Sequence, residues 1–112
     1  MRSDRERLLD ILEAIAKIEQ HPCSDIEAFT DNEMQQVWVI HHFQIVGEAA
    51  YGMSQQFKAD HPQIPWEQII GMRHVLVHGY FQIDLDIVWA VVEKDLPPLK
   101  SAIEAIIRQP EG

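Results

Sequence analysis

Residues 3–18 read SDRERLLDILEAIAKI, and they combine a helix start signal with an apolar stripe at helical spacing. Ser3 and Glu6 have the spacing of a capping box, in which each side chain accepts a hydrogen bond from the other residue's backbone N–H. Apolar residues then recur every three or four positions: Leu8, Ile11, Leu12, Ile15 and Ile18. This stretch predicts an amphipathic helix that ends near His21-Pro22 and buries its stripe against other helices.

A second, longer helix is predicted to follow. Thr30 and Glu33 repeat the capping spacing, and residues at three- and four-residue steps extend from there to Phe57. This predicted stripe contains Met34, Val37, Trp38, His41, Ile45, Glu48 and Ala49. Gly47 and Gly52 weaken a helix relative to alanine, so they indicate close packing against another helix or chain.

The second half of the chain predicts two more helices. Pro65 is well placed as the first residue of a third helix that ends near Gly79, and Asp84 as the N-cap of a fourth. Pro97-Pro98 must kink or restart that last helix. Because no segment has the two-residue period of a strand, we predict one all-α domain over residues 1–112, a four- to five-helix up-down bundle.

Composition narrows the class of protein further. The 112 residues are 46% hydrophobic and carry a formal net charge of −9, which argues against strong non-specific binding to nucleic acid. The single cysteine, Cys23, has no partner for an internal disulfide, which is typical of a reducing compartment. The longest apolar run, residues 87–92, is too short to cross a bilayer. We therefore expect a cytoplasmic protein with no membrane partner.

The segment GMRHVLVHGY at residues 71–80 places charged groups within an apolar stretch. Arg73 offers planar, permanently charged donors suited to phosphate oxygens, and the His78 imidazole titrates near neutral pH. Five helical positions separate them by about 140° around the axis, so within one chain they converge only if the helix ends between them. Gly79 supplies a reason for a helix end at an exposed rim.

A purely structural interpretation of this segment stays open. In it, Arg73 pairs with Glu48 or Glu67, His78 caps a helix end, and Tyr80 packs against Trp89. The tryptophans and methionines are interpreted as core, and only Phe81 as a candidate for stacking on a base. For His21, His42 and His61 a solvated or capping role is expected.

A metal centre is the weakest of the alternatives. His74 and His78 are four apart and share one face of a continuing helix, but no third ligand follows at motif spacing. We expect no metal and no cofactor, and a dimeric metal-binding bundle remains a third possibility.

Together these residues resemble a known family. Arg73-x4-His78-x-Tyr80 is similar to the motif of HEPN-domain ribonucleases in their HepT-like form, and IVGEAA at residues 45–50 resembles that family's preceding helix. The flanks at residues 64–73 and 80–84 match as well, so the resemblance covers roughly residues 5–107. One position differs: the family usually has Asn or Asp directly after the arginine, where this chain has His74.

The resemblance implies a HEPN-like homodimer that acts as a metal-independent endoribonuclease toxin on an RNA substrate. Its antitoxin, in a type VII-like toxin–antitoxin system, is a minimal nucleotidyltransferase that silences the toxin by AMPylation of Tyr80. Arg73 and His78 are the expected catalytic residues, with His74 and Glu48 in supporting roles, and two copies of the motif line one cleft at the dimer interface. The alternative is a non-enzymatic helical subunit that serves a nucleotidyltransferase.

Overall fold

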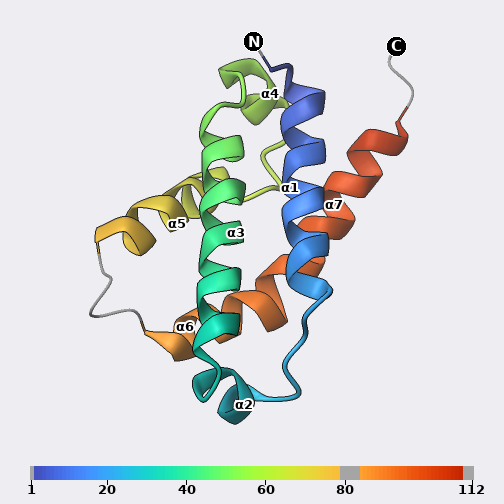
Figure 1. Cartoon of the computed structure of the whole chain (residues 1–112). Coiled ribbons are helices and arrows are strands. Elements are labelled where there is room, and N and C mark those ends of the chain that lie inside the picture. The colour runs from blue at the N-terminus through green and yellow to red at the C-terminus, as the bar shows by residue number, and fades with distance from the viewer. Residues whose placement is uncertain (1, 79–83, 110–112) are drawn as a thin grey trace.

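The chain folds as an all-α bundle (Figure 1). The computed structural model describes residues 2–78 and 84–109, with the side chains of this range apart from residues 72 and 74–78. The elements are α1 (Asp4–Glu19), α2 (Ile26–Thr30), α3 (Glu33–Tyr51), α4 (Gln55–Asp60), α5 (Trp66–His78), α6 (Leu85–Ala90), a π-helical segment η1 (Val91–Asp95) and α7 (Leu96–Arg108). Helices α1 and α3 run side by side in opposite directions, and α5 crosses α3 on the other side (Figure 1).

The first helix matches its prediction. Ser3 Oγ accepts a hydrogen bond from the Glu6 backbone N–H at 3.1 Å, and Glu6 Oε1 accepts one from the Ser3 N–H at 3.0 Å. This bond to the Ser3 backbone holds the pKa of Glu6 below its ordinary value. The predicted start and stop of the bundle's first member are therefore confirmed, the helix ending at Glu19 just before His21-Pro22.

The second predicted helix has both of its ends elsewhere. It begins at Glu33 with Asn32 as N-cap, while Thr30 is the last residue of the separate α2. It ends at Tyr51 rather than near Phe57, because Gly52 closes it and Ser54 then caps α4. The prediction missed the short helices α2 and α4. Asn32, two positions after Thr30, caps α3 in its place, and Ser54, three positions after Tyr51, starts a new helix where the prediction continued the old one.

Pro97 and Pro98 interrupt the last helical segment of the bundle. Asp84 caps α6, and α7 carries Pro97 and Pro98 in its first turn. Proline lacks an N–H donor and its ring displaces the carbonyl four residues earlier, which explains why the wider π-helical turn at residues 91–95 lies between the two helices. The predicted interruption is confirmed as a restart, because α7 begins at Leu96, directly before the two prolines.

The buried face of α3 differs from the predicted stripe. Its core residues are Val39, His42, Phe43, Val46, Gly47, Ala49 and Ala50. Met34 is 85% exposed and Val37 61% exposed, so their interpretation as core is wrong. His42 is buried, not solvated: its Nδ1 lies 2.8 Å from the Trp38 carbonyl oxygen, a bond in which the ring donates. Helix α3 is apolar on two sides, and periodicity alone cannot choose between them.

No helix within the described residues is long and apolar enough to cross a bilayer.

Candidate active site around Arg73

Arg73 lies where α5 crosses α3, and a glycine makes the crossing close. A Cβ atom added to Gly47 would lie 3.0 Å from Arg73 Cβ, 3.1 Å from Arg73 N and 3.3 Å from the Ile69 carbonyl oxygen. A side chain at this position would require Arg73 or its helix to shift by a few tenths of an ångström. The expectation that Gly47 marks close helix packing is confirmed, and the contact is made with the candidate catalytic residue itself.

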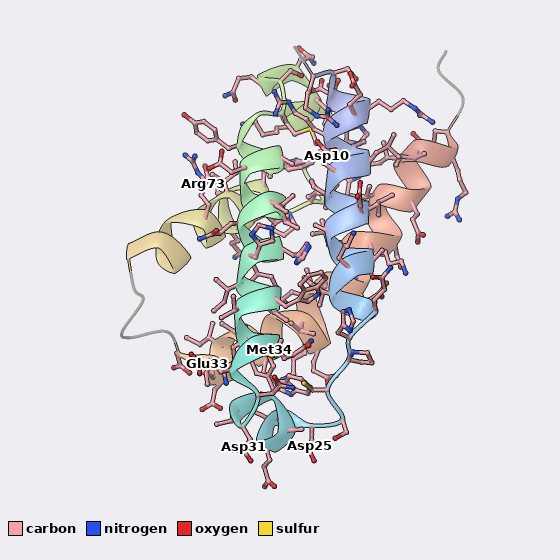
Figure 2. The ribbon with its side chains drawn as sticks, in the orientation of Figure 1. Asp10, Asp25, Asp31, Glu33, Met34 and Arg73 are labelled. Atoms are coloured by element: carbon pink, nitrogen blue, oxygen red, sulfur yellow. The ribbon has the colours of Figure 1, made fainter. Side chains whose placement is uncertain are left out.

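Two α3 side chains hold the Arg73 guanidinium. Nη1 donates a hydrogen bond of 2.9 Å to Glu48 Oε1, and Cζ lies 3.8 Å from the centroid of the Tyr51 ring. The bond to Glu48 raises the pKa of Arg73, so the group stays cationic at every physiological pH. Figure 2 places Arg73 beside α3, on the side away from Asp10 of α1.

The guanidinium is only partly engaged by these contacts. Its side chain is 19% exposed, and Nε is buried without a hydrogen-bond partner among the described residues. An unpaired buried donor costs free energy and is uncommon in folded proteins. The arrangement suits a fixed, planar cation that awaits oxygen acceptors such as those of a phosphate.

The contact between Arg73 and Glu48 is compatible with both a structural and a catalytic role for Arg73. An ion pair to Glu48 fits a structural arginine as well as one oriented for chemistry, and Glu67, the other predicted partner, is not the one used. Tyr51 was missed by sequence reasoning. A signal existed, because Tyr51 follows Glu48 by three positions and so lies one turn along the same helix face.

Helix α5 continues unbroken through His78. The predicted helix end near Gly79 lies outside the described residues, and no break in α5 falls between Arg73 and His78. The two positions are therefore about 140° apart around one helix axis. His74 is likewise within α5, whereas the side chains of His74 and His78, and all of Tyr80 and Phe81, lie outside the described residues.

The metal alternative finds no support in the part of the chain that is described. There, no group of three or more His, Cys, Asp or Glu side chains is arranged to hold an ion.

Comparison with known proteins identifies the class. The model of the HepT-like ribonuclease family matches residues 11–106, and the chain belongs to that family. It is 38% identical to a protein of Thermococcus cleftensis named "Probable ribonuclease HepT", over 94% of this chain and 96% of that one. It is also 35% identical to a "Putative RNase" of Methanocaldococcus jannaschii, over 88% of this chain and 92% of that one.

A third relative places the same unit in a longer protein. A Methanocaldococcus jannaschii protein named as a gamma-glutamylcyclotransferase and putative RNase is 37% identical over 97% of this chain, which spans 50% of that protein. No solved structure matches the chain. The family and its relatives' names support a ribonuclease activity.

Proposed function

We propose that this chain is a metal-independent endoribonuclease, the toxin of a type VII-like toxin–antitoxin system, which cuts RNA in the cytoplasm at a site built on Arg73 and His78. The observation that carries the proposal is the fixed guanidinium of Arg73, held by Glu48 and Tyr51 with a buried donor still unpaired. Membership of a ribonuclease family supplies the substrate class.

The chemistry needs three functions and no metal. A base takes the proton of a ribose 2′-OH, whose oxygen then bonds to the adjacent phosphorus. The bond from phosphorus to the 5′-oxygen breaks, and an acid protonates that leaving oxygen. His78 serves as base or acid because imidazole titrates near neutral pH, and Arg73 stabilises the charge that builds up on the phosphoryl oxygens. The products are a 2′,3′-cyclic phosphate and a 5′-OH.

A homodimer supplies both the acid and the base. Along α3, Met34, Val37, His41, Glu48 and Tyr51 fall within about 100° of the helix circumference, and all of them are exposed. Met34 and Val37 form the apolar half of this face and are exposed to solvent. Glu48 and Tyr51 form the other half and contact Arg73. A second copy packed on it about a two-fold axis would bury Met34 and Val37 and bring two Arg73 and two His78 residues to one cleft.

A separate proposal concerns control of the activity. Tyr80 follows His78 by two positions, so its phenol is close in sequence to the proposed acid–base group. A minimal nucleotidyltransferase would join the Tyr80 oxygen to the α-phosphorus of ATP, with pyrophosphate leaving. The attached AMP would fill the cleft and offer its phosphate to Arg73. Its test is the mass of the co-expressed protein, which gains one adenylyl group in wild type and not in Tyr80→Phe.

His74 takes the position where the family usually has Asn or Asp. We assign it a supporting role as a further donor to phosphate, since imidazole donates through a ring N–H in either protonation state. The same substitution also fits the second candidate function, a non-enzymatic helical subunit of a nucleotidyltransferase, in which cleavage is absent.

The deciding experiment is cleavage of single-stranded RNA in EDTA, with end-group analysis of the products. We expect wild-type protein to cut and to leave cyclic phosphate ends, and His78→Ala and Arg73→Ala each to lower the rate by at least about 100-fold. Equal cutting by wild type and His78→Ala would remove His78 from the mechanism. A wild-type protein that does not cut, and is harmless when expressed alone, would favour the adaptor function.

A further inference from the structure

A groove of about 350 Å³ lies between α1 and α3, next to the Arg73 site. Its polar lining comes from Arg7 and Asp10 of α1, from His41, Gln44 and Glu48 of α3, and from Arg2, which precedes α1. Glu48 lines this groove and also accepts the hydrogen bond from Arg73, so the groove and the arginine meet at one side chain. Asp10 and Arg73 mark the two sides of α3 in Figure 2.

The groove offers one arginine, Arg7, that has no carboxylate partner among the described residues. The chain has a net charge of −9, yet three of its nine Lys and Arg residues lie between positions 2 and 7. Arg2 is neutralised, because it donates to both carboxylate oxygens of Asp10 at 2.6 and 2.7 Å. Arg7 has no ion pair among the described residues, so no carboxylate there offsets its positive charge.

Arg7 reaches the groove by lying over a glycine. A Cβ atom added to Gly52 would overlap the Arg7 guanidinium, so the absence of a side chain at Gly52 leaves room for it. Gly52 is the C-cap of α3, directly after Tyr51, whose ring contacts Arg73. Arg7 from α1 and Arg73 from α5 thus both reach the C-terminal part of α3.

We propose that this groove is a second phosphate-binding subsite, in which Arg7 contacts a phosphate of the RNA strand away from the one at Arg73. The assignment rests on the proposed ribonuclease function. A polyanionic strand gains from several fixed cations at once, and a guanidinium presents paired donors to phosphate oxygens. The strand crosses α3 at Glu48, whose negative charge Arg73 balances. Repulsion from the acidic remainder of the surface then confines RNA to this path.

The test compares two arginines of the same helix. Arg5 is exposed in the first turn of α1 but does not line the groove, so Arg5→Gln removes the same charge without the contact. Binding of a labelled single-stranded RNA is measured by fluorescence anisotropy at several salt concentrations, in His78→Ala protein so that the RNA stays intact. Arg7→Gln should weaken binding about five- to tenfold and lower the slope of log affinity against log salt by about 0.7. Arg5→Gln should keep the slope.

A conservative variant separates binding from folding. Arg7→Lys keeps the positive charge and should retain the salt slope, while thermal unfolding followed by circular dichroism should be similar for all three variants. Equal affinities and slopes for Arg7→Gln and Arg5→Gln would overturn the assignment, as would an equal loss in Arg7→Lys. If wild type cuts RNA through His78 while Arg7→Gln binds normally, the subsite alone fails; if wild type neither binds nor cuts RNA, the ribonuclease function fails with it.

Discussion

At the scale of single residues, Arg73 is held by two contacts that contribute little to stability. Both partners of Arg73 are exposed, Glu48 by 63% of its side chain and Tyr51 by 56%, and solvent weakens ion pairs and cation–π contacts of this kind. Their main effect is on orientation, because together they fix both the plane and the direction of the guanidinium. Variants at these positions should therefore change catalysis more than folding.

Removing the charge of Glu48 should show this difference. Glu48→Gln keeps an oxygen acceptor but loses the ionic hydrogen bond, so we expect RNA cleavage to fall about tenfold, with the free energy of unfolding changed by less than about 1 kcal/mol. Steady-state cleavage and thermal unfolding measure the two effects. Glu67→Gln, an exposed acid on α5 that does not contact Arg73, is the matched control. A Glu48→Gln rate equal to that of the control would make the ion pair irrelevant to catalysis.

Tyr51 contacts the Arg73 guanidinium with the face of its ring, and we expect the ring to matter more than the hydroxyl. Tyr51→Phe preserves the face on which Arg73 stacks and should cleave at nearly the wild-type rate, whereas Tyr51→Leu should lose roughly threefold to tenfold. The comparison is made by kcat and KM for one RNA substrate. Should Tyr51→Phe be as slow as Tyr51→Leu, the phenol oxygen would be the group that matters.

At the scale of elements, the α3–α5 crossing is the contact with the least room. Gly47→Ala places a methyl group 3.0 Å from Arg73 Cβ and 3.1 Å from Arg73 N, so one helix must move. We expect a loss of about 1–3 kcal/mol in the free energy of unfolding, which exceeds the gain in helix propensity of about 1 kcal/mol. A denaturant titration measures this change.

Gly71 is the internal control for this prediction. A Cβ atom there meets nothing within 4 Å, and Gly71 lies inside α5. Gly71→Ala should therefore stabilise the protein by about 0.5–1 kcal/mol through helix propensity alone. If Gly47→Ala stabilises the protein as Gly71→Ala does, then α3 and α5 can move apart enough to accommodate the methyl group, and the predicted clash at Gly47 is wrong.

At the scale of the whole molecule, the exposed face of α3 predicts the state of assembly. Val37→Glu introduces a charge where a second copy is proposed to pack, so light scattering should find a monomer that has lost cleavage activity. Leu9→Glu changes a comparable residue, 45% exposed on α1, and should leave the dimer intact. A wild-type protein that is already monomeric, or a Val37→Glu dimer, contradicts this arrangement.

How much of the molecule the sequence predicts depends on how local each signal is. Ser3, Pro65, Asp84 and the Pro97-Pro98 pair act within one or two turns, and the helices begin or break where these residues require. The face of α3 is set by its neighbours instead. With Val39 and Phe43 on one side and Met34 and Val37 on the other, only the positions of α1 and α5 decide which side is buried.

The candidate site follows the same division. The motif itself indicated Arg73, and the helical spacing along α3 pointed to Glu48, which does contact it. Tyr51 lies one turn beyond Glu48 on α3, so spacing could have indicated it, whereas Arg7 reaches Gly52 through tertiary packing that no spacing within one helix predicts. Helix α5 runs through both Arg73 and His78, which places the two positions about 140° apart around its axis, and the spacing alone could not predict this continuity because Gly79 also suited a helix end.

The glycine at position 47 also affects how relatives of this chain should be interpreted. We expect a copy that retains Arg73, His78 and Tyr80 but carries a side chain at position 47 to be less active, because the added carbon requires Arg73 to shift by a few tenths of an ångström. Such loss would leave no trace in the motif and would involve no residue with a functional group. The residue at position 47 should therefore be checked, along with the motif, before a family member is assigned nuclease activity.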